Sequence, residues 1–168
     1  YELTSEDTIE MRARFRPLRD AWKKHGFIGV FFASYIHAPE DMAIHFIGRS
    51  RSGKGKARPR WISCLPKTHG EQACHRPAGS DWDPPLDPGF NISLVQGVSE
   101  YEYLQPFYYG ISHGKVFIMM FKDITDQGEL RFAQSPSGGG KGNPAWDFVF
   151  LARNYEIGKD IGFTAAAV

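Results

Sequence analysis

The sequence has little that points to nucleic acid or membrane as a partner. Its 20 basic and 19 acidic residues leave a formal charge of +1, whereas domains that bind a nucleic-acid backbone usually carry a clear basic excess. The longest apolar run, around Phe27–Ala33, is too short and too interrupted by glycine to span a bilayer. We therefore predict no membrane-spanning segment, and composition gives no general reason to expect nucleic acid.

Cysteine is scarce as well, with only Cys64 and Cys74 in 168 residues. A disulfide between them would close a short loop and stabilise the fold by about 2–3 kcal/mol through loop entropy. Two reduced thiols fit the sequence equally well. A zinc site with His69 and His75 has suitable ligand types but lacks the paired short spacing of structural zinc sites. Disulfide and free thiols remain open, and no metal site is expected.

The two ends of the sequence suggest a secreted protein of which these 168 residues are only a part. It starts at Tyr1 with neither a methionine nor a charged-then-apolar leader, and residues 163–168 still have strand character. We expect an extracellular or periplasmic location. No linker divides the chain, so residues 1–168 are expected to form a single domain.

Alternation of apolar and charged side chains over residues 8–16 predicts a half-buried strand that ends at Pro17. Residues 27–37 are apolar on both faces, which favours a central strand. We expect this strand to form a hairpin with residues 42–48 through a turn at 38–41. His113-Gly114 predicts a second, tight hairpin between two later strands.

Further strands are predicted at 60–65, 90–95, 105–112, 115–121, 130–134, 145–151 and 161–167. About ten short strands punctuated by glycine and proline indicate an all-β fold. We expect an antiparallel β-sandwich of the jelly-roll type, with a closed β-barrel as the alternative. Strands that are apolar on both faces, such as 116–121, predict that one sheet face is covered by loops or by a partner.

The main functional signal is the supply of flat aromatic rings next to polar side chains. Sugars present apolar C–H faces edged with hydroxyls, so sugar sites combine aromatic platforms with hydrogen-bonding groups. We expect a carbohydrate held against one sheet face, and the candidate ligand-binding residues are His37, His45, Trp61, Tyr109, Arg131 and Gln134. Arg131 and Gln134 lie on opposite faces of one strand, so only one of them can share a given cavity.

Whether the chain is an enzyme stays open at this point. The candidates for a general base are His45 and Tyr109, which would suit a polysaccharide lyase or glycoside hydrolase. No cofactor is expected. Calcium at the acidic loop that holds Asp81, Asp83 and Asp87 is the weaker alternative to bare surface acid, because the loop lacks the glycine and ligand spacing of an EF-hand.

Residues 49–60 place six basic side chains within twelve positions. Such a loop can bind an anionic polymer, for example a sulfated glycan or a nucleic-acid backbone. A solvated loop between two strands is the alternative reading. No aromatic residue is interleaved within this loop, which weakens the nucleic-acid interpretation.

Three segments, 106–110, 131–140 and 143–148, resemble bacterial β-sandwich proteins of unassigned role found among polysaccharide-degradation proteins. The resemblance implies an all-β fold and a carbohydrate context, and it assigns no catalytic residue. Our first hypothesis is a secreted carbohydrate-binding or carbohydrate-processing β-sandwich. The second is a non-catalytic structural module that packs against another domain or a second copy, in a homo-oligomer. The third is anionic-polymer binding through the basic loop 49–60.

Overall fold

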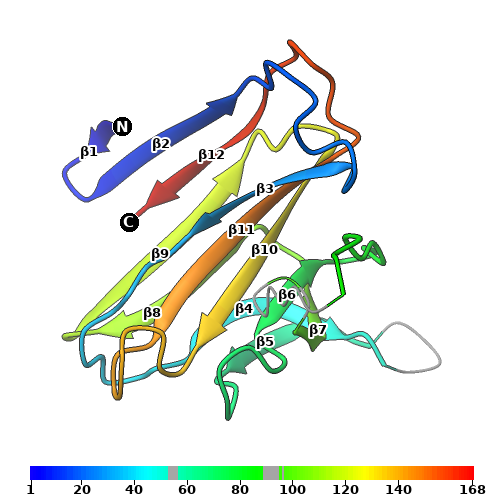
Figure 1. Cartoon of the computed structure of the whole chain (residues 1–168). Coiled ribbons are helices and arrows are strands. Elements are labelled where there is room, and N and C mark those ends of the chain that lie inside the picture. Colours follow the sequence, from blue (N-terminus) through cyan, green and yellow to red (C-terminus); the bar gives the residue numbers. More distant parts are fainter. Residues whose placement is uncertain (53–56, 89–94, 96) are drawn as a thin grey trace.

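The computed structural model describes residues 1–52, 57–88, 95 and 97–168. Its regular elements are strands joined by turns and loops (Figure 1). They are β1 (Glu2–Ser5), β2 (Thr8–Phe15), β3 (Phe27–Phe32), β4 (Ile44–Ser50), β5 (Arg60–Cys64), β6 (Cys74–Pro77), β7 (Val98–Tyr103), β8 (Phe107–Ser112), β9 (Lys115–Lys122), β10 (Gly128–Ser135), β11 (Ala145–Arg153) and β12 (Ile161–Ala167). The strand expected at 90–95 lies outside the described residues except for Val95, as do Lys54 and Lys56 of the basic loop.

The strands of the described part of the chain belong to one sheet, in the order β1-β2-β12-β9-β8-β4-β7-β6-β10-β11-β3, with β5 attached to β4. Pairing is antiparallel except between β6 and β7. Strands β1 and β3 are the two ends of this order, so the sheet is not closed into a barrel among the described residues. The sheet instead curves over on itself, and β10 and β11 lie over β8, β9 and β12 (Figure 1).

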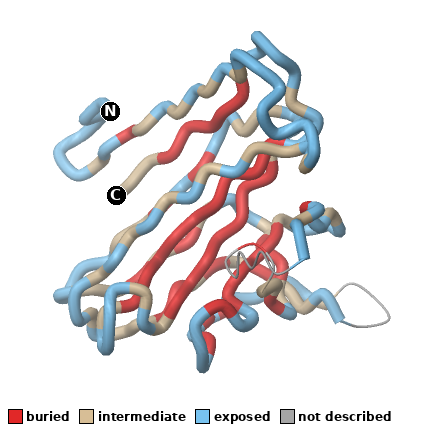
Figure 2. The backbone as a smooth tube through the Cα atoms, viewed as in Figure 1, coloured by how far each residue is buried: buried red, intermediate tan, exposed pale blue. Residues whose placement is uncertain are grey.

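Aromatic side chains from the two halves of the sheet meet in the space between them. Phe121 of β9 lies 4.8 Å from Phe148 of β11 and 5.8 Å from Phe132 of β10, measured between ring centroids. Phe163 of β12 packs edge-on against Phe148 at 5.6 Å. Figure 2 shows this buried core along β10, β11 and β12. The prediction of an all-β, sandwich-like fold is confirmed.

Two of the local predictions are confirmed and one is wrong. The alternating segment forms β2 as expected, and the hairpin of β8 and β9 turns at His113 and Gly114, whose φ angles of 53° and 70° are those of a tight primed turn. The hairpin expected between 27–37 and 42–48 is wrong. Strand β3 pairs with β11, from Phe27↔Arg153 to Phe32↔Phe148, and β4 pairs with β5, β7 and β8.

The physical reason is that apolar content on both faces predicts burial but not the position of a strand in the sheet. In β3 the inner side chains Ile28 and Phe32 extend the core beside β11. The other edge of the strand has no partner strand among the described residues, so β3 ends the sheet and is not central.

The two outer faces of the sheet differ. Over β10 and β11, Trp82 and Val95 cover Val149 and Leu151, so β11 is buried on both sides. On β9 the outer side chain Val116 is exposed. No helix in the described residues is long and apolar enough to cross a membrane.

Candidate functional site

Three of the candidate ligand-binding residues come together on the outer face of β4, β5 and β8. Register pairs His45 of β4 with Tyr109 of β8 and with Ser63 of β5. It also pairs Trp61 of β5 with Ile47, two residues further along β4 on the same face. We call the side chains of His45, Trp61, Phe107 and Tyr109 the aromatic platform.

The rings of the platform pack against one another, and Trp61 is the most exposed of them. His45 and Tyr109 are stacked, with centroids 4.8 Å apart and planes 19° apart. Trp61 stands edge-on to Tyr109 at 5.5 Å and to Phe107 at 6.1 Å. Trp61 is 57 % exposed, although a tryptophan ring usually finds burial in a core. All four residues are placed by strands, which hold a site more rigidly than loops do.

A carboxylate fixes the orientation of the platform's histidine. Nε2 of His45 lies 3.0 Å from Oδ2 of Asp41, and the other carboxylate oxygen of Asp41 accepts the backbone N–H of Ala43 at 2.8 Å. When Nε2 donates to Asp41, Nδ1 is left as an acceptor. The arrangement places a hydrogen-bonding imidazole edge beside flat apolar rings.

Arg131 is placed on the other side of the sandwich and serves the fold. Its side chain is buried and donates to Glu129 Oε1 at 2.6 Å, to the Val95 carbonyl at 2.8 Å and to the Trp82 carbonyl at 2.6 Å. The guanidinium also lies 5.7 Å from the Trp82 ring centroid. These contacts hold the loop residues against the outer face of β10 and β11, far from the platform.

Gln134 lies on the opposite face of β10 from Arg131, as the strand alternation predicts. Its amide N–H₂ donates to the Met42 carbonyl at 2.7 Å, and the indole N–H of Trp146 donates to the same oxygen at 3.0 Å. Both donors anchor the segment that leads into β4. Gln134 therefore supports the platform from beneath and does not reach its surface.

The remaining candidates lie apart from the platform. His37 is exposed in the connection between β3 and β4. In the basic loop, Arg49 is held in an ion pair with Glu102 at 2.5 Å. In the acidic loop, Asp83 pairs with Arg76 and Asp87 with Lys24. The described residues contain no cluster of three or more His, Cys, Asp or Glu side chains that could hold a metal ion.

Cys64 and Cys74 are separate, buried thiols in the structure. Burial raises the pKa of Cys64 to about 12. Burial also raises the pKa of Cys74 to about 11, against the opposing influence of Arg131. Both side chains are therefore protonated and poorly nucleophilic at neutral pH.

Sequence reasoning missed the part played by Asp41 and Ser63. The sequence places Asp41 in a turn, and its spacing of four positions from His45, across a loop, carries no information on orientation. Ser63 faces His45 only because β5 pairs with β4 in this register. The sequence signal that could have placed Ser63 beside Trp61 is the period of two along the strand predicted at 60–65, which puts residues 61 and 63 on one face.

Comparisons with known proteins add no relative: the chain matches no protein-family model, no curated protein and no solved structure.

Proposed function

We propose that this protein binds a carbohydrate chain laid flat on the aromatic platform. The observation that carries the proposal is the exposure of Trp61, whose ring stands edge-on to Tyr109, which is itself stacked on His45. An exposed ring of this kind offers the apolar C–H face of a sugar a partner of matching shape. The polar groups of His45, Asp41 and Ser63 lie beside these rings and offer hydrogen bonds to the hydroxyls at the edge of a sugar.

The platform is made of side chains on three neighbouring strands, so it is broad and shallow. A surface of this shape favours an extended or multi-residue glycan over a single sugar, because one sugar ring would cover only part of it. Affinity would come mainly from a few aromatic contacts with a polar rim, as in other interfaces dominated by hot-spot residues.

Carbohydrate processing is a second candidate, favoured by the pair of Asp41 and His45. A histidine oriented by a carboxylate, here with His45 Nε2 3.0 Å from Asp41 Oδ2, is one arrangement that supports general-base catalysis. A lyase reaction on a uronate-containing polysaccharide would give an unsaturated product that absorbs ultraviolet light. Incubation with such polysaccharides, followed by absorbance, therefore separates processing from binding alone.

The decisive experiment compares the native protein with Trp61→Ala on a glycan array, with and without added calcium. We expect binding to one class of glycan, weakened about tenfold or more by the substitution, which corresponds to about 1.4 kcal/mol. Tyr35→Ala is the matched control, since Tyr35 is another exposed ring at 62 % exposure and lies outside the platform. Native protein that binds no glycan, or Trp61→Ala that binds as well as native protein, would refute the proposal.

A further inference from the structure

Among the described residues, strand β3 is an open edge of the sheet, and its sequence lacks the features that usually protect such an edge. Its sequence, Phe-Ile-Gly-Val-Phe-Phe, contains no charge and no proline, and its pairing with β11 is unbroken by a bulge. The opposite end of the sheet, β1, is protected: it has four residues, carries Glu2 and shifts register between Leu3 and Ser5. Unprotected apolar edges are templates for pairing with another strand.

The hydrogen bonds that flank β3 show which backbone groups face outward. Asn154 N–H donates to the Gly26 carbonyl at 3.0 Å, and Trp146 N–H donates to the Ser34 carbonyl at 2.9 Å. The backbone N–H and C=O groups of the even-numbered residues therefore point to β11, because hydrogen-bonded and non-hydrogen-bonded pairs alternate along an antiparallel strand. Phe27, Gly29 and Phe31 direct their N–H and C=O groups away from β11, where no described strand receives them.

We propose that β3 pairs with β3 of a second copy of this chain, antiparallel and centred on Gly29. In this register Gly29 lies opposite Gly29 of the second copy. Phe27 of each copy lies opposite Phe31 of the other, so this aromatic pair forms twice. The outward backbone groups of the three residues then pair with their own counterparts, as a two-fold symmetric interface requires. Opposed aromatic residues are favourable cross-strand pairs, and the central glycines leave room for the rings.

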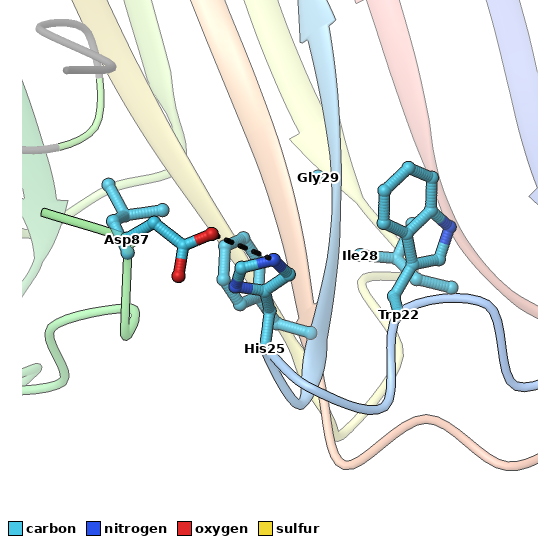
Figure 3. Close-up of a pocket in the computed structure, with 7 residues that line it drawn as sticks. Trp22, His25, Ile28, Gly29 and Asp87 are labelled. Carbon is cyan, nitrogen blue, oxygen red and sulfur yellow. Dashed lines mark ion pairs between the residues drawn. The ribbon is translucent and has the colours of Figure 1, made fainter. Parts of the chain in front are cut away.

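The surroundings of β3 fit this partner. Phe31 is 47 % exposed, and Trp22 beside the start of the strand is 54 % exposed. A cleft of about 430 Å³ opens there, with Trp22 on one side of β3 and with His25 and Asp87 on the other (Figure 3). Phe27 lines this cleft, so Phe31 of the second copy would reach its rim.

Charge does not oppose the pairing. The same register sets Lys24 against Ser34 of the second copy, so no like charges face each other across the joint. Lys24 is also held by Asp87, whose carboxylate lies 2.6 Å away. The interface uses a different edge from the aromatic platform and does not depend on carbohydrate binding.

The test is the mass of the purified protein in solution between about 1 µM and 1 mM, by sedimentation or light scattering. We expect a concentration-dependent rise towards twice the 19.0 kDa of one chain. Phe31→Lys should abolish the rise by placing a charge on the edge, while Val116→Lys, at a similarly exposed position on β9, should leave it intact. Trp61→Ala should not change the mass.

Hydrogen exchange gives a second readout that needs no variant. The amides of Phe27, Gly29 and Phe31 should be protected at high protein concentration and exchange freely at low concentration. Protein that stays monomeric throughout would overturn the proposal. So would a dimer that survives Phe31→Lys, and its loss in Val116→Lys would then indicate assembly through the outer face of β9.

Discussion

The ring of His45 lies stacked on the ring of Tyr109, with centroids 4.8 Å apart and planes 19° apart. The two residues form the single register pair between β4 and β8, because β4 turns to β7 as its partner from Gly48 onward. The stacked rings are therefore also the cross-strand side-chain contact between β4 and β8 on the outer face. Its geometry depends on Asp41, which binds the far edge of the imidazole.

Asp41→Asn should weaken glycan binding without unfolding the protein. The amide oxygen of asparagine can still accept the Ala43 N–H, while the charged partner of His45 is lost. We expect a threefold to tenfold loss of affinity, equivalent to about 1 kcal/mol. Calorimetric titration with the glycan found on the array measures it, and the thermal midpoint is the control. Unchanged affinity would show that Asp41 does not position His45 for the ligand.

The platform shows how far sequence reasoning reaches. Trp61, His45 and Tyr109 could be named from residue type, because exposed or half-buried rings on alternating strands suit sugars. Their convergence could not be predicted, since the expected hairpin placed β4 beside β3 and not between β5 and β8. Arg131 looked like a ligand residue in sequence, and only the tertiary structure reveals that Glu129, Val95 and Trp82 use its donors.

The same limit applies to β3. Its apolar faces correctly predicted a strand, and its inner residues do pack on the core. Strand order, however, depends on long-range pairing, which the local pattern does not contain. A strand at the end of a sheet and one in its middle can have the same composition when a loop or a second molecule covers the first.

Cys64 and Cys74 should resist thiol reagents in the native protein. Burial raises the pKa of both thiols, to about 12 and about 11, so little thiolate exists at pH 8. We expect almost no reaction with a chromogenic disulfide reagent until denaturant is added, and then two thiols per chain without prior reduction. Finding no thiol after unfolding would instead demonstrate a disulfide.

His75 should make the fold sensitive to acid. The ring is fully buried against Phe46, at 4.7 Å between centroids, and neither ring nitrogen makes a hydrogen bond of normal geometry to a described residue. Burial lowers the pKa of His75 to about 3, with the Tyr101 backbone acting the other way. In the unfolded chain the imidazole of His75 takes up a proton below about pH 6.5, whereas in the folded chain it stays neutral down to about pH 3. Its contribution to stability is thus present above pH 6.5 and lost as pH falls towards 3.

Urea unfolding between pH 7.5 and pH 4 measures this loss, with His75→Leu as the comparison. His75→Leu removes no hydrogen bond of normal geometry to a described residue. The free energy of unfolding of this variant should fall less steeply with decreasing pH than that of the native protein, by at most about 1.4 kcal/mol per pH unit. Parallel curves for the two proteins would mean that His75 is not held neutral.

Asp147 should act in the opposite direction. Asp147 is 2 % exposed, and its carboxylate accepts the Ser34 N–H at 2.7 Å, just beyond the end of β3. Burial raises the pKa of Asp147 to about 6, against the effect of that hydrogen bond. The folded state therefore favours the protonated acid, and this stabilisation is full below pH 3.8 and lost as pH rises through 6. Asp147→Asn should be more stable than native protein at pH 8, by about 2 kcal/mol, and similar to it near pH 4. A pH-independent difference would contradict this.

A side chain at Gly110 should destabilise the fold, because the indole of Trp146 occupies the space where its Cβ would lie. A Cβ built at Gly110 would collide with three atoms of the six-membered ring, and Trp146 is itself fully buried. Gly110→Ala should therefore cost about 1–3 kcal/mol in the free energy of unfolding, the usual range for an overpacked core. The double variant Gly110→Ala/Trp146→Phe tests the cause, since the smaller ring leaves room for the methyl group. Its loss should be smaller than the two single losses together, by at least about 0.5 kcal/mol. Additive losses would place the cost in the backbone of β8 and not in contact with Trp146.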